Sequence, residues 1–313
     1  GAGTDNLAIT ATDFSDTIAV AGAAGSNTVV VNGASVTFVH DTGAEDTLAV
    51  ASGLGNDSLS ITPTTGLAIV ADAGAGSDDV SVVGTAAADA ISVALNARTI
   101  NGLGGQVSLT AVESLSVQGN GGSDTVTLTE LGLSSEFNTT SLSVTGGSLT
   151  VEGTAGDETI SVSPTAAGVG SFSEADAGPA VDYSGFDTAT TFDGNSGFDV
   201  LVVNGNDAAD TVTSTANSLT IKGGEITLAD LDRLELNTGG GDDNIDLDLQ
   251  ASSLEKVVNS GTGDDVVDAS GAIDATINGG DGDDLLVGSP VGDLINGQSG
   301  DDTIDGGAGD DLL

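Results

Sequence analysis

Short stretches of alternating apolar and polar residues recur along the chain, separated by turns that contain small or acidic residues. Residues 27–31 (Asn-Thr-Val-Val-Val) and 57–61 (Asp-Ser-Leu-Ser-Ile) are two examples. Alternation with a period of two is typical of half-buried β-strands. In the first hundred residues, an aliphatic residue follows a turn residue by two positions at Asp5/Leu7, Asp16/Ile18, Asn27/Val29, Asp46/Leu48, Asp57/Leu59, Asp78/Val80 and Asp89/Ile91.

The spacing of these turn residues predicts a repeated path of the chain. Successive turn residues are 11, 11, 19, 11, 21 and 11 positions apart. Half-repeats of about ten or eleven residues, paired into repeats of about twenty-one, account for this series. No stretch combines helical periodicity with helix caps. We therefore expect an all-β chain folded as a right-handed parallel β-helix, or β-roll, solenoid.

A larger unit of about 120 residues occurs twice. Residues 107–117 recur at 226–236 with an offset of 119, and Asp78 and Asp89 reappear as Asp199 and Asp210 with an offset of 121. Residues of about 70–130 and 190–250 are therefore interpreted as two copies. Nested repeats favour an irregular β-solenoid over residues 1–258; β-sandwich modules of that size remain the alternative.

Residues 164–191 are the least regular part of the sequence. The spacing between turn residues widens there to 41, from Glu158 to Asp199. We expect a loop or an extra hairpin bulging from the solenoid, with aromatic residues that fill a gap in the core: Phe172, Tyr183 and Phe186.

The last thirty-five residues consist of four units of nine, the last one shortened: GGDGDDLLV, GSPVGDLIN, GQSGDDTID and GGAGDDLL. Each unit has glycine at its first position, aspartate at its sixth and an aliphatic residue at its eighth. This pattern fits G-G-x-G-x-D-x-U-x, the repeat of calcium-binding parallel β-rolls. The aliphatic residues Leu286 and Ile304 should stack on one inner face, and Ile295 and Leu313 on the other.

On these motifs, residues 259–313 resemble the RTX, or haemolysin-type, calcium-binding repeats of secreted bacterial proteins. The resemblance implies several Ca²⁺ ions held between successive turns, with Asp284 paired with Asp302 and Asp293 with Asp311. Turn carbonyls would complete the coordination. The predicted calcium-site residues in the best-matching turns are Asp243, Asp265, Gly280, Gly282, Asp283, Asp284, Asp293, Gly300, Asp302, Gly309 and Asp311.

The match weakens at some turns. Ser289, Pro290 and Val291 replace the glycine-rich sequence before Asp293. Asp78, Asp124 and Asp199 lie in looser versions of the turn and complete the candidate set. Asp16, Asp46 and Asp89 lack the glycines, and we expect them to be solvated or to cap turns.

The repeated aspartates pose an electrostatic problem that a cation would solve. Stacked carboxylates about 4.8 Å apart repel by roughly 3 kcal/mol per pair at an effective dielectric constant near 20. Calcium suits such a site because it accepts six to eight oxygen ligands in flexible geometry, whereas magnesium tends to retain its waters. Glycines permit the left-handed backbone that these turns need.

The charge of the chain restricts its partners. Forty-eight acidic residues stand against four basic ones, for a net charge of −44. Such a chain would be repelled by nucleic acid and by anionic membranes. No apolar run approaches 18 residues, so we expect no membrane insertion. There is no cysteine, which is compatible with a secreted protein stapled by metal. Without calcium, we expect the last 55 residues to be disordered.

Three functions are compatible with this sequence. The first is a structural extracellular protein of a surface layer, fibre or adhesin, which could assemble head-to-tail or contact a surface polysaccharide. The second is a calcium-dependent folding and secretion module of a type I-exported protein. The third is a β-helix enzyme that acts on polysaccharide. His40 beside Asp41 has no identifiable serine partner, so a catalytic triad has little support and we predict a non-enzyme. The sequence reads as a piece of a longer chain.

Overall fold

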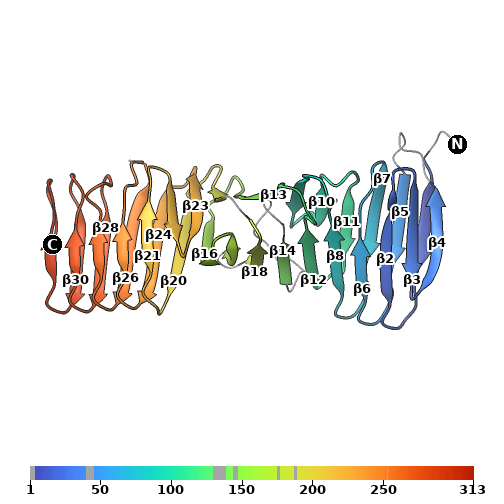
Figure 1. The fold of residues 1–313 in the computed structure, drawn as a ribbon, viewed down its shortest axis with the longest axis horizontal. Helices are drawn as coiled ribbons and strands as arrows, with labels where there is room; N and C mark the ends of the chain where they lie inside the picture. The colour runs from blue at the N-terminus through green and yellow to red at the C-terminus, as the bar shows by residue number, and fades with distance from the viewer. Residues whose placement is uncertain are drawn as a thin grey trace. The chain divides into compact units, whose positions relative to one another are not determined.

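The computed structural model describes residues 4–39, 46–129, 139–143, 147–174, 177–186, 189–251 and 253–313. His40 and Asp41 lie outside these residues. All elements are β-strands, so the all-β prediction is confirmed (Figure 1). Within the described ranges, no helix is long and apolar enough to cross a membrane. The chain divides into an N-terminal unit, Gly1–Thr150 with Asp176–Asp187, and a C-terminal unit, Val151–Ala175 with Thr188–Leu313.

The N-terminal unit contains two sheets. The first has the order β1 (Asn6–Thr10), β5 (Asp46–Ala51), β7 (Leu67–Asp72), β11 (Val107–Thr110), β10 (Thr99–Asn101), β9 (Ala90–Ala94) and β13 (Asp124–Thr129). The second has the order β4 (Ala34–Val39), β3 (Ser26–Val31), β2 (Thr17–Ala23), β6 (Ser58–Ile61), β8 (Asp79–Val83), β12 (Ser114–Gln118), β14 (Thr139–Ser143) and β18 (Ala177–Ser184). The boundary between the units falls within β15 (Gly147–Glu152).

The C-terminal unit also contains two sheets. The first has the order β19 (Thr190–Asp193), β23 (Gly224–Ala229), β22 (Ser218–Ile221), β21 (Thr211–Ser214), β25 (Asn244–Asp246), β27 (Val266–Asp268), β29 (Leu285–Val287) and β31 (Thr303–Asp305). The second has the order β17 (Val169–Glu174), β16 (Thr159–Ala166), β20 (Val200–Asn206), β24 (Arg233–Gly240), β26 (Glu255–Thr262), β28 (Thr276–Asp281) and β30 (Leu294–Ser299).

From β24 to β31, consecutive strands alternate between the two sheets. Each strand from β26 onward pairs in parallel with the strand two positions earlier, so that β24, β26, β28 and β30 follow one another in one sheet (Figure 1). Leu236 pairs with Val258, Val258 with Ile277, and Ile277 with Ile295. The repeat therefore shortens from 22 to 19 and then to 18 residues. Equivalent residues form continuous rows across the strands. The boundary expected at residue 259, between the irregular solenoid and the calcium-binding repeats, lies inside the C-terminal unit.

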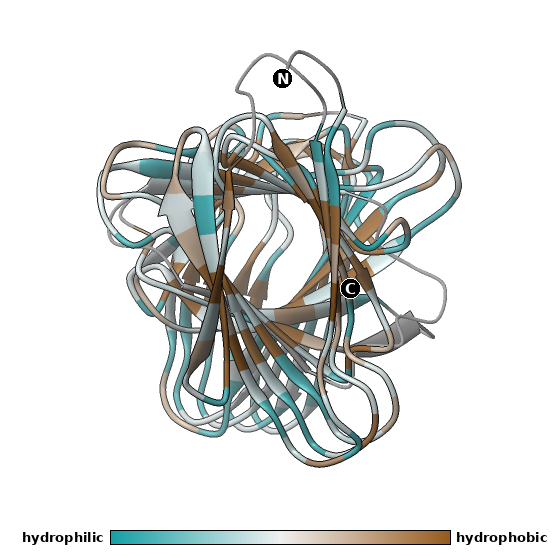
Figure 2. Ribbon diagram, turned by 90° about the vertical axis from the view of Figure 1, so that its right-hand side faces the viewer, coloured by the Kyte–Doolittle hydropathy of each residue, from teal (hydrophilic) through white to brown (hydrophobic). Residues whose placement is uncertain are grey.

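The aliphatic rows are partly as predicted. Leu286 pairs with Ile304 in one sheet, and Ile295 lies in the other. Leu286 and Ile295 are buried, whereas Leu313 is 65% exposed, so its predicted burial is wrong. Leu313 directly follows the parallel bridge between Leu294 and Leu312. The core is aliphatic, and hydrophobic residues concentrate on the strands while many turns are hydrophilic (Figure 2).

Antiparallel pairing interrupts the parallel pattern. β9, β10 and β11 form an antiparallel meander, and β21, β22 and β23 form the same arrangement about 120 residues later. The β2–β3–β4 and β16–β17 pairs are antiparallel as well. Purely parallel pairing is therefore absent from these stretches, because short turns such as Asn32-Gly33 reverse the chain at once.

The irregular stretch contains the β16–β17 hairpin, which belongs to a sheet and does not bulge from it. Its aromatic residues are buried: Phe172 contacts Phe192 edge-to-face at 5.9 Å between ring centroids. In the N-terminal unit, Tyr183 and Phe186 lie 6.3 Å apart and are also buried. Aromatic side chains thus fill the core where the repeat is least regular, as predicted.

Candidate metal centre: columns of aspartates in the turns

A column of aspartates, here called the inner column, occupies the turns that enter β25, β27, β29 and β31. It consists of Asp243, Asp265, Asp284 and Asp302. The carboxylate of each accepts a hydrogen bond from the backbone N–H of the aspartate one repeat earlier: 2.8 Å from Asp243 to Asp265, 2.9 Å from Asp265 to Asp284 and 3.1 Å from Asp284 to Asp302. The parallel register creates this column because it places equivalent turn positions in adjacent repeats side by side.

A second column, the outer column, consists of the residue before each inner aspartate: Asp242, Asp264, Asp283 and Asp301. Its hydrogen bonds run in the opposite direction, since each carboxylate accepts the N–H of the following repeat. The N-to-Oδ1 distances are 3.1 Å from Asp264 to Asp242, 2.9 Å from Asp283 to Asp264 and 2.8 Å from Asp301 to Asp283. Each Asp-Asp pair thus ties its repeat to both neighbours.

Three of the four inner carboxylates retain one unused oxygen each. Oδ1 is occupied by the backbone bond, but Oδ2 of Asp243, Asp265 and Asp284 is buried without a hydrogen-bond partner. These residues are between 1% and 3% exposed. A buried, unpaired charged oxygen is costly unless a cation or donor meets it. The row of free oxygens is therefore suited to a positively charged ligand.

Burial raises the pKa of these same carboxyl groups. For Asp243, Asp265 and Asp284, loss of solvent is the largest cause of the raised pKa, and neighbouring aspartates raise it further. Hydrogen bonds from the backbone oppose the shift. The neighbouring hydroxyls of Thr238 at Asp243 and Ser260 at Asp265 also oppose it, although each donates its own hydrogen bond to a backbone carbonyl. The folded chain disfavours the ionised carboxylates unless their charge is neutralised.

The glycine that opens each repeat makes room for its aspartate. A Cβ added at Gly279 would overlap Oδ2 of Asp284, and one added at Gly297 would overlap Oδ2 of Asp302. The aspartate side chain folds back over the residue five positions earlier. The sequence analysis did not find this role of the first glycine. The available signal was the constant spacing of five residues between that glycine and the aspartate of the same unit.

The predicted turn glycines have the left-handed backbone that was expected of them. Positive φ angles occur at Gly280 (130°), Gly282 (141°), Gly300 (146°) and Gly309 (132°). A Cβ at Gly300 would overlap the carbonyl oxygen of Gly282, one repeat earlier. The backbones of adjacent turns therefore approach too closely for any side chain, which places turn carbonyls beside the aspartate columns.

The turns on the opposite side hold a shorter column. Asp293 accepts the N–H of Ala275 at 2.8 Å, and Asp311 accepts the N–H of Asp293 at 3.1 Å. Ser289 donates its N–H and its hydroxyl to Asp293, at 2.6 and 2.9 Å. Asp293 therefore already has a full set of donors, in keeping with its departure from the glycine-rich pattern.

The looser candidates have the same geometry. Asp78, Asp124 and Asp199 each accept a backbone N–H from one repeat earlier, and each has a buried Oδ2 without a partner. Burial raises the pKa of Asp78 and Asp199, and neighbouring acidic groups add to it. Asp16, Asp46 and Asp89 were expected to be solvated or to cap turns. Asp16 and Asp46 are buried, at 3% and 0% exposure, so the first of these two alternatives is wrong for them.

Asp16 caps its turn, which was the second of the two alternatives expected for it. It accepts the N–H and the hydroxyl of Thr12 and the amide of Asn32. These donors, the Thr12 N–H first, hold the pKa of Asp16 below its usual value, although burial opposes them. Asp89 accepts the N–H of Thr85 at 2.7 Å in the same way. Both carboxylates are satisfied without a metal.

The acidic side chains alone do not complete a calcium site. Among the described residues, no three acidic or histidine side chains converge on one metal position. An ion would have to combine carboxylate oxygens of adjacent repeats with turn carbonyls. Calcium accepts such mixed oxygen sets, and the unpaired Oδ2 atoms supply oxygens that nothing else uses.

One further ladder was missed in the sequence. Asn204, Asn237, Asn259 and Asn278 occupy one row, and each amide nitrogen donates to the asparagine one repeat earlier, at 3.3, 2.7 and 2.8 Å. An asparagine directly after the buried aliphatic residue of each strand was the available signal. Asparagine ladders add hydrogen bonds along stacked parallel strands.

A comparison of this chain with models of known protein families and with curated proteins finds no match.

Proposed function

We propose that this chain is a structural extracellular protein, a right-handed parallel β-helix or β-roll solenoid of the RTX type that calcium ions between its repeats hold together. The observation that carries the proposal is the row of buried, unpaired Oδ2 atoms on Asp243, Asp265 and Asp284. The alternation of strands between two sheets from β24 to β31 supports the solenoid. The net charge of −44 supports a need for counter-ions.

The stability of such an assembly depends on the cation. Neighbouring carboxylates about 4.8 Å apart repel by roughly 3 kcal/mol per pair at an effective dielectric constant near 20. Repeated along the inner column, this repulsion is comparable with the whole stability of a domain, about 5–15 kcal/mol. A divalent ion between two repeats reverses the sign of the interaction. Calcium sites of extracellular modules bind at about 10⁻⁴–10⁻³ M, which matches a protein that folds outside the cell.

The test is folding with and without calcium. Circular dichroism in excess chelator should show partial loss of β-structure and a lower unfolding temperature, and calcium should restore both while magnesium at equal concentration should not. Calorimetric titration should give several ions per chain. A chain that is equally β-structured and equally stable in chelator would overturn the proposal.

A specific observation favours self-association. Of the described residues, only β3 pairs with β4, and Val36 and Val39 on β4 are 49% and 71% exposed. An unpaired strand edge is a template for another strand. Light scattering of the calcium-loaded protein should therefore show mass growing with concentration, and a constant monomer mass would remove this part of the proposal.

The alternative function is a calcium-dependent folding and secretion module of an exported protein. The same inner column favours it, since the aspartates would keep the chain unfolded at low calcium. The two functions differ in what calcium does for a fused passenger: a secretion module should be required for its export, whereas a structural segment should not.

A further inference from the structure

Lys256 lies in the interior of the C-terminal unit, where lysine is rare. It is 2% exposed and aligns with Leu234 in β24. The next two repeats carry Ala275 and Asp293 in the same row, directly before the paired Thr276 and Leu294. This row therefore changes from an acid at Asp293 to a cation at Lys256. A buried ammonium is tolerated only with a full set of acceptors.

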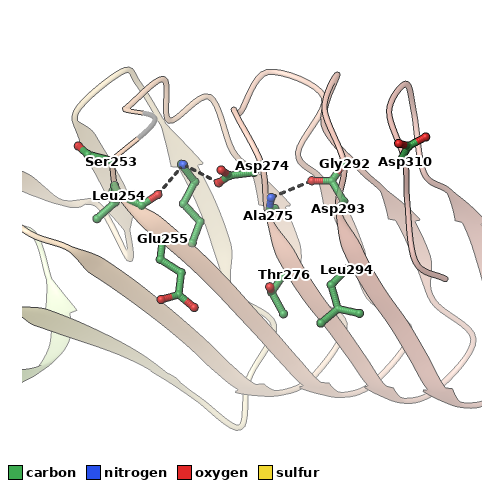
Figure 3. A pocket seen from close by; sticks show the side chains of 11 residues that line it. Ser253, Leu254, Glu255, Asp274, Ala275, Thr276, Gly292, Asp293, Leu294 and Asp310 are labelled. Carbon is green, nitrogen blue, oxygen red and sulfur yellow. Dashed lines mark hydrogen bonds and ion pairs between the residues drawn. The ribbon is translucent and has the colours of Figure 1, made fainter.

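The ammonium of Lys256 is enclosed by oxygens from two successive repeats. Nζ donates to the backbone carbonyls of Ala251 at 2.9 Å, Leu254 at 2.7 Å and Ile273 at 2.6 Å. The carboxylate of Asp274 lies 3.3 Å away. Ala251 and Leu254 precede β26, and Ile273 and Asp274 precede β28. Figure 3 shows the bonds to Leu254 and Asp274, and that of Ala275 to Asp293 on the neighbouring turn.

Three carbonyls and one carboxylate form the kind of oxygen set that calcium selects. They come from the turns of adjacent repeats, as the ligands of an ion between repeats would. The three carbonyls are spaced to accept the three N–H donors of an ammonium. In their chemistry they are equally able to bind another cation. A surface pocket of about 400 Å³ adjoins these oxygens, and residues of three successive turns, Lys256, Asp274 and Asp293 among them, line it. Figure 3 shows its lining side chains.

We propose that these oxygens form a cation site whose occupant is the protein's own Lys256 ammonium. The comparison with a calcium ion rests on the proposed function, but the cage itself rests on the four contacts. The tethered cation joins the turn before β26 to the turn before β28 at any calcium concentration. Lys256 and the four residues that its ammonium contacts thus form a metal-independent clamp beside the metal-dependent inner column.

Removal of the tethered cation should open the site to a free one. Equilibrium dialysis with calcium alone should show one more ion per chain in Lys256→Ala than in the wild-type protein. Lys256→Met is the matched control, because its side chain fills the same space without charge, and it should gain no ion. Asp274→Asn added to Lys256→Ala should abolish the extra ion. An equal number of ions in Lys256→Ala and the wild type would overturn the proposal.

A measurement on the wild-type protein decides the matter if the variants do not fold. Hydrogen exchange in chelator should leave the amides of Lys256 and Thr276 as protected as in calcium, while those of Asp265 and Asp284, which donate along the inner column, lose protection. Equal loss at all four would overturn the clamp. If the wild-type chain binds no calcium, the proposed function fails, whereas an ion gained by Lys256→Ala would still support the cage.

Discussion

The carboxylate of Asp302 accepts a hydrogen bond from the backbone N–H of Asp284, 3.1 Å away and one repeat earlier. The bond uses one oxygen of Asp302. Asp284 presents its own Oδ1 to the N–H of Asp265, and its Oδ2 is buried and unpaired. Asp243, Asp265 and Asp284 therefore each serve the backbone with one oxygen, while the other oxygen has no hydrogen-bond partner. The predictions below separate these two roles.

Asp284→Asn should separate the charge of the inner column from its backbone bond. Asparagine can still accept the N–H of Asp265 but carries no charge. In chelator the variant should be more stable than wild type by about 1–3 kcal/mol, because repulsion from neighbouring aspartates is removed. In calcium it should be less stable and bind fewer ions.

Urea denaturation in both conditions measures this reversal of sign. Asp246→Asn is the matched control, since that aspartate is exposed in β25 and makes the same change of charge. The interpretation of Asp284 as a ligand would be wrong if both variants shifted stability equally in the two conditions.

Gly297→Ala should destabilise the protein by about 1–3 kcal/mol, the usual range for overpacking. The added methyl group would overlap Oδ2 of Asp302 and push the carboxylate out of its place. Calcium affinity should fall together with stability. Gly156→Ala is the control, because its nearest neighbours would lie 3.5 Å from the new Cβ, and it should change the melting temperature little.

Asn259→Ala should break two bonds of the asparagine ladder, to Asn237 and from Asn278. The expected loss is about 1–3 kcal/mol for two hydrogen bonds. Calcium affinity should stay unchanged because the ladder does not adjoin the inner column. Thermal unfolding in saturating calcium, with Asn217→Ala at an exposed position as control, measures the difference. A fall in ion number would show instead that the ladder positions the calcium turns.

Acid should stabilise the calcium-free protein. The pKa values of Asp199, Asp243, Asp265 and Asp284 are raised above the ordinary 3.8, with burial as the main cause. Between the ordinary and the raised pKa the folded state binds more protons than the unfolded state. The free energy of unfolding then rises as pH falls through this window. Asp16 acts in the opposite direction because its pKa is lowered.

Chemical denaturation in chelator, repeated from neutral pH downwards, tests this sign. The calcium-loaded protein should show the reverse trend, since protons displace the ions. A calcium-free chain that loses stability steadily on acidification would show that the buried carboxylates do not dominate its pH dependence.

Much of the local structure follows from the order of residues. Alternation of apolar and polar residues is enough to predict strands, because one face of each strand must be buried. The fixed nine-residue spacing predicts that Leu286 stacks on Ile304 and that Asp284 lies beside Asp302, and both are found. The positive φ of Gly282 and Gly300 follows in the same way from glycine at fixed turn positions.

The sequence by itself therefore determined the all-β class, the positions of the turns and the identity of the carboxylate column, because each depends on a short-range period. Only the tertiary structure decided the meander of β9–β11, the asparagine row and the four oxygens around Lys256. Those features depend on which residues of distant repeats lie opposite one another. Where the repeat length varies, register depends on packing and hydrogen bonding across the whole sheet, and a fixed local period does not predict it.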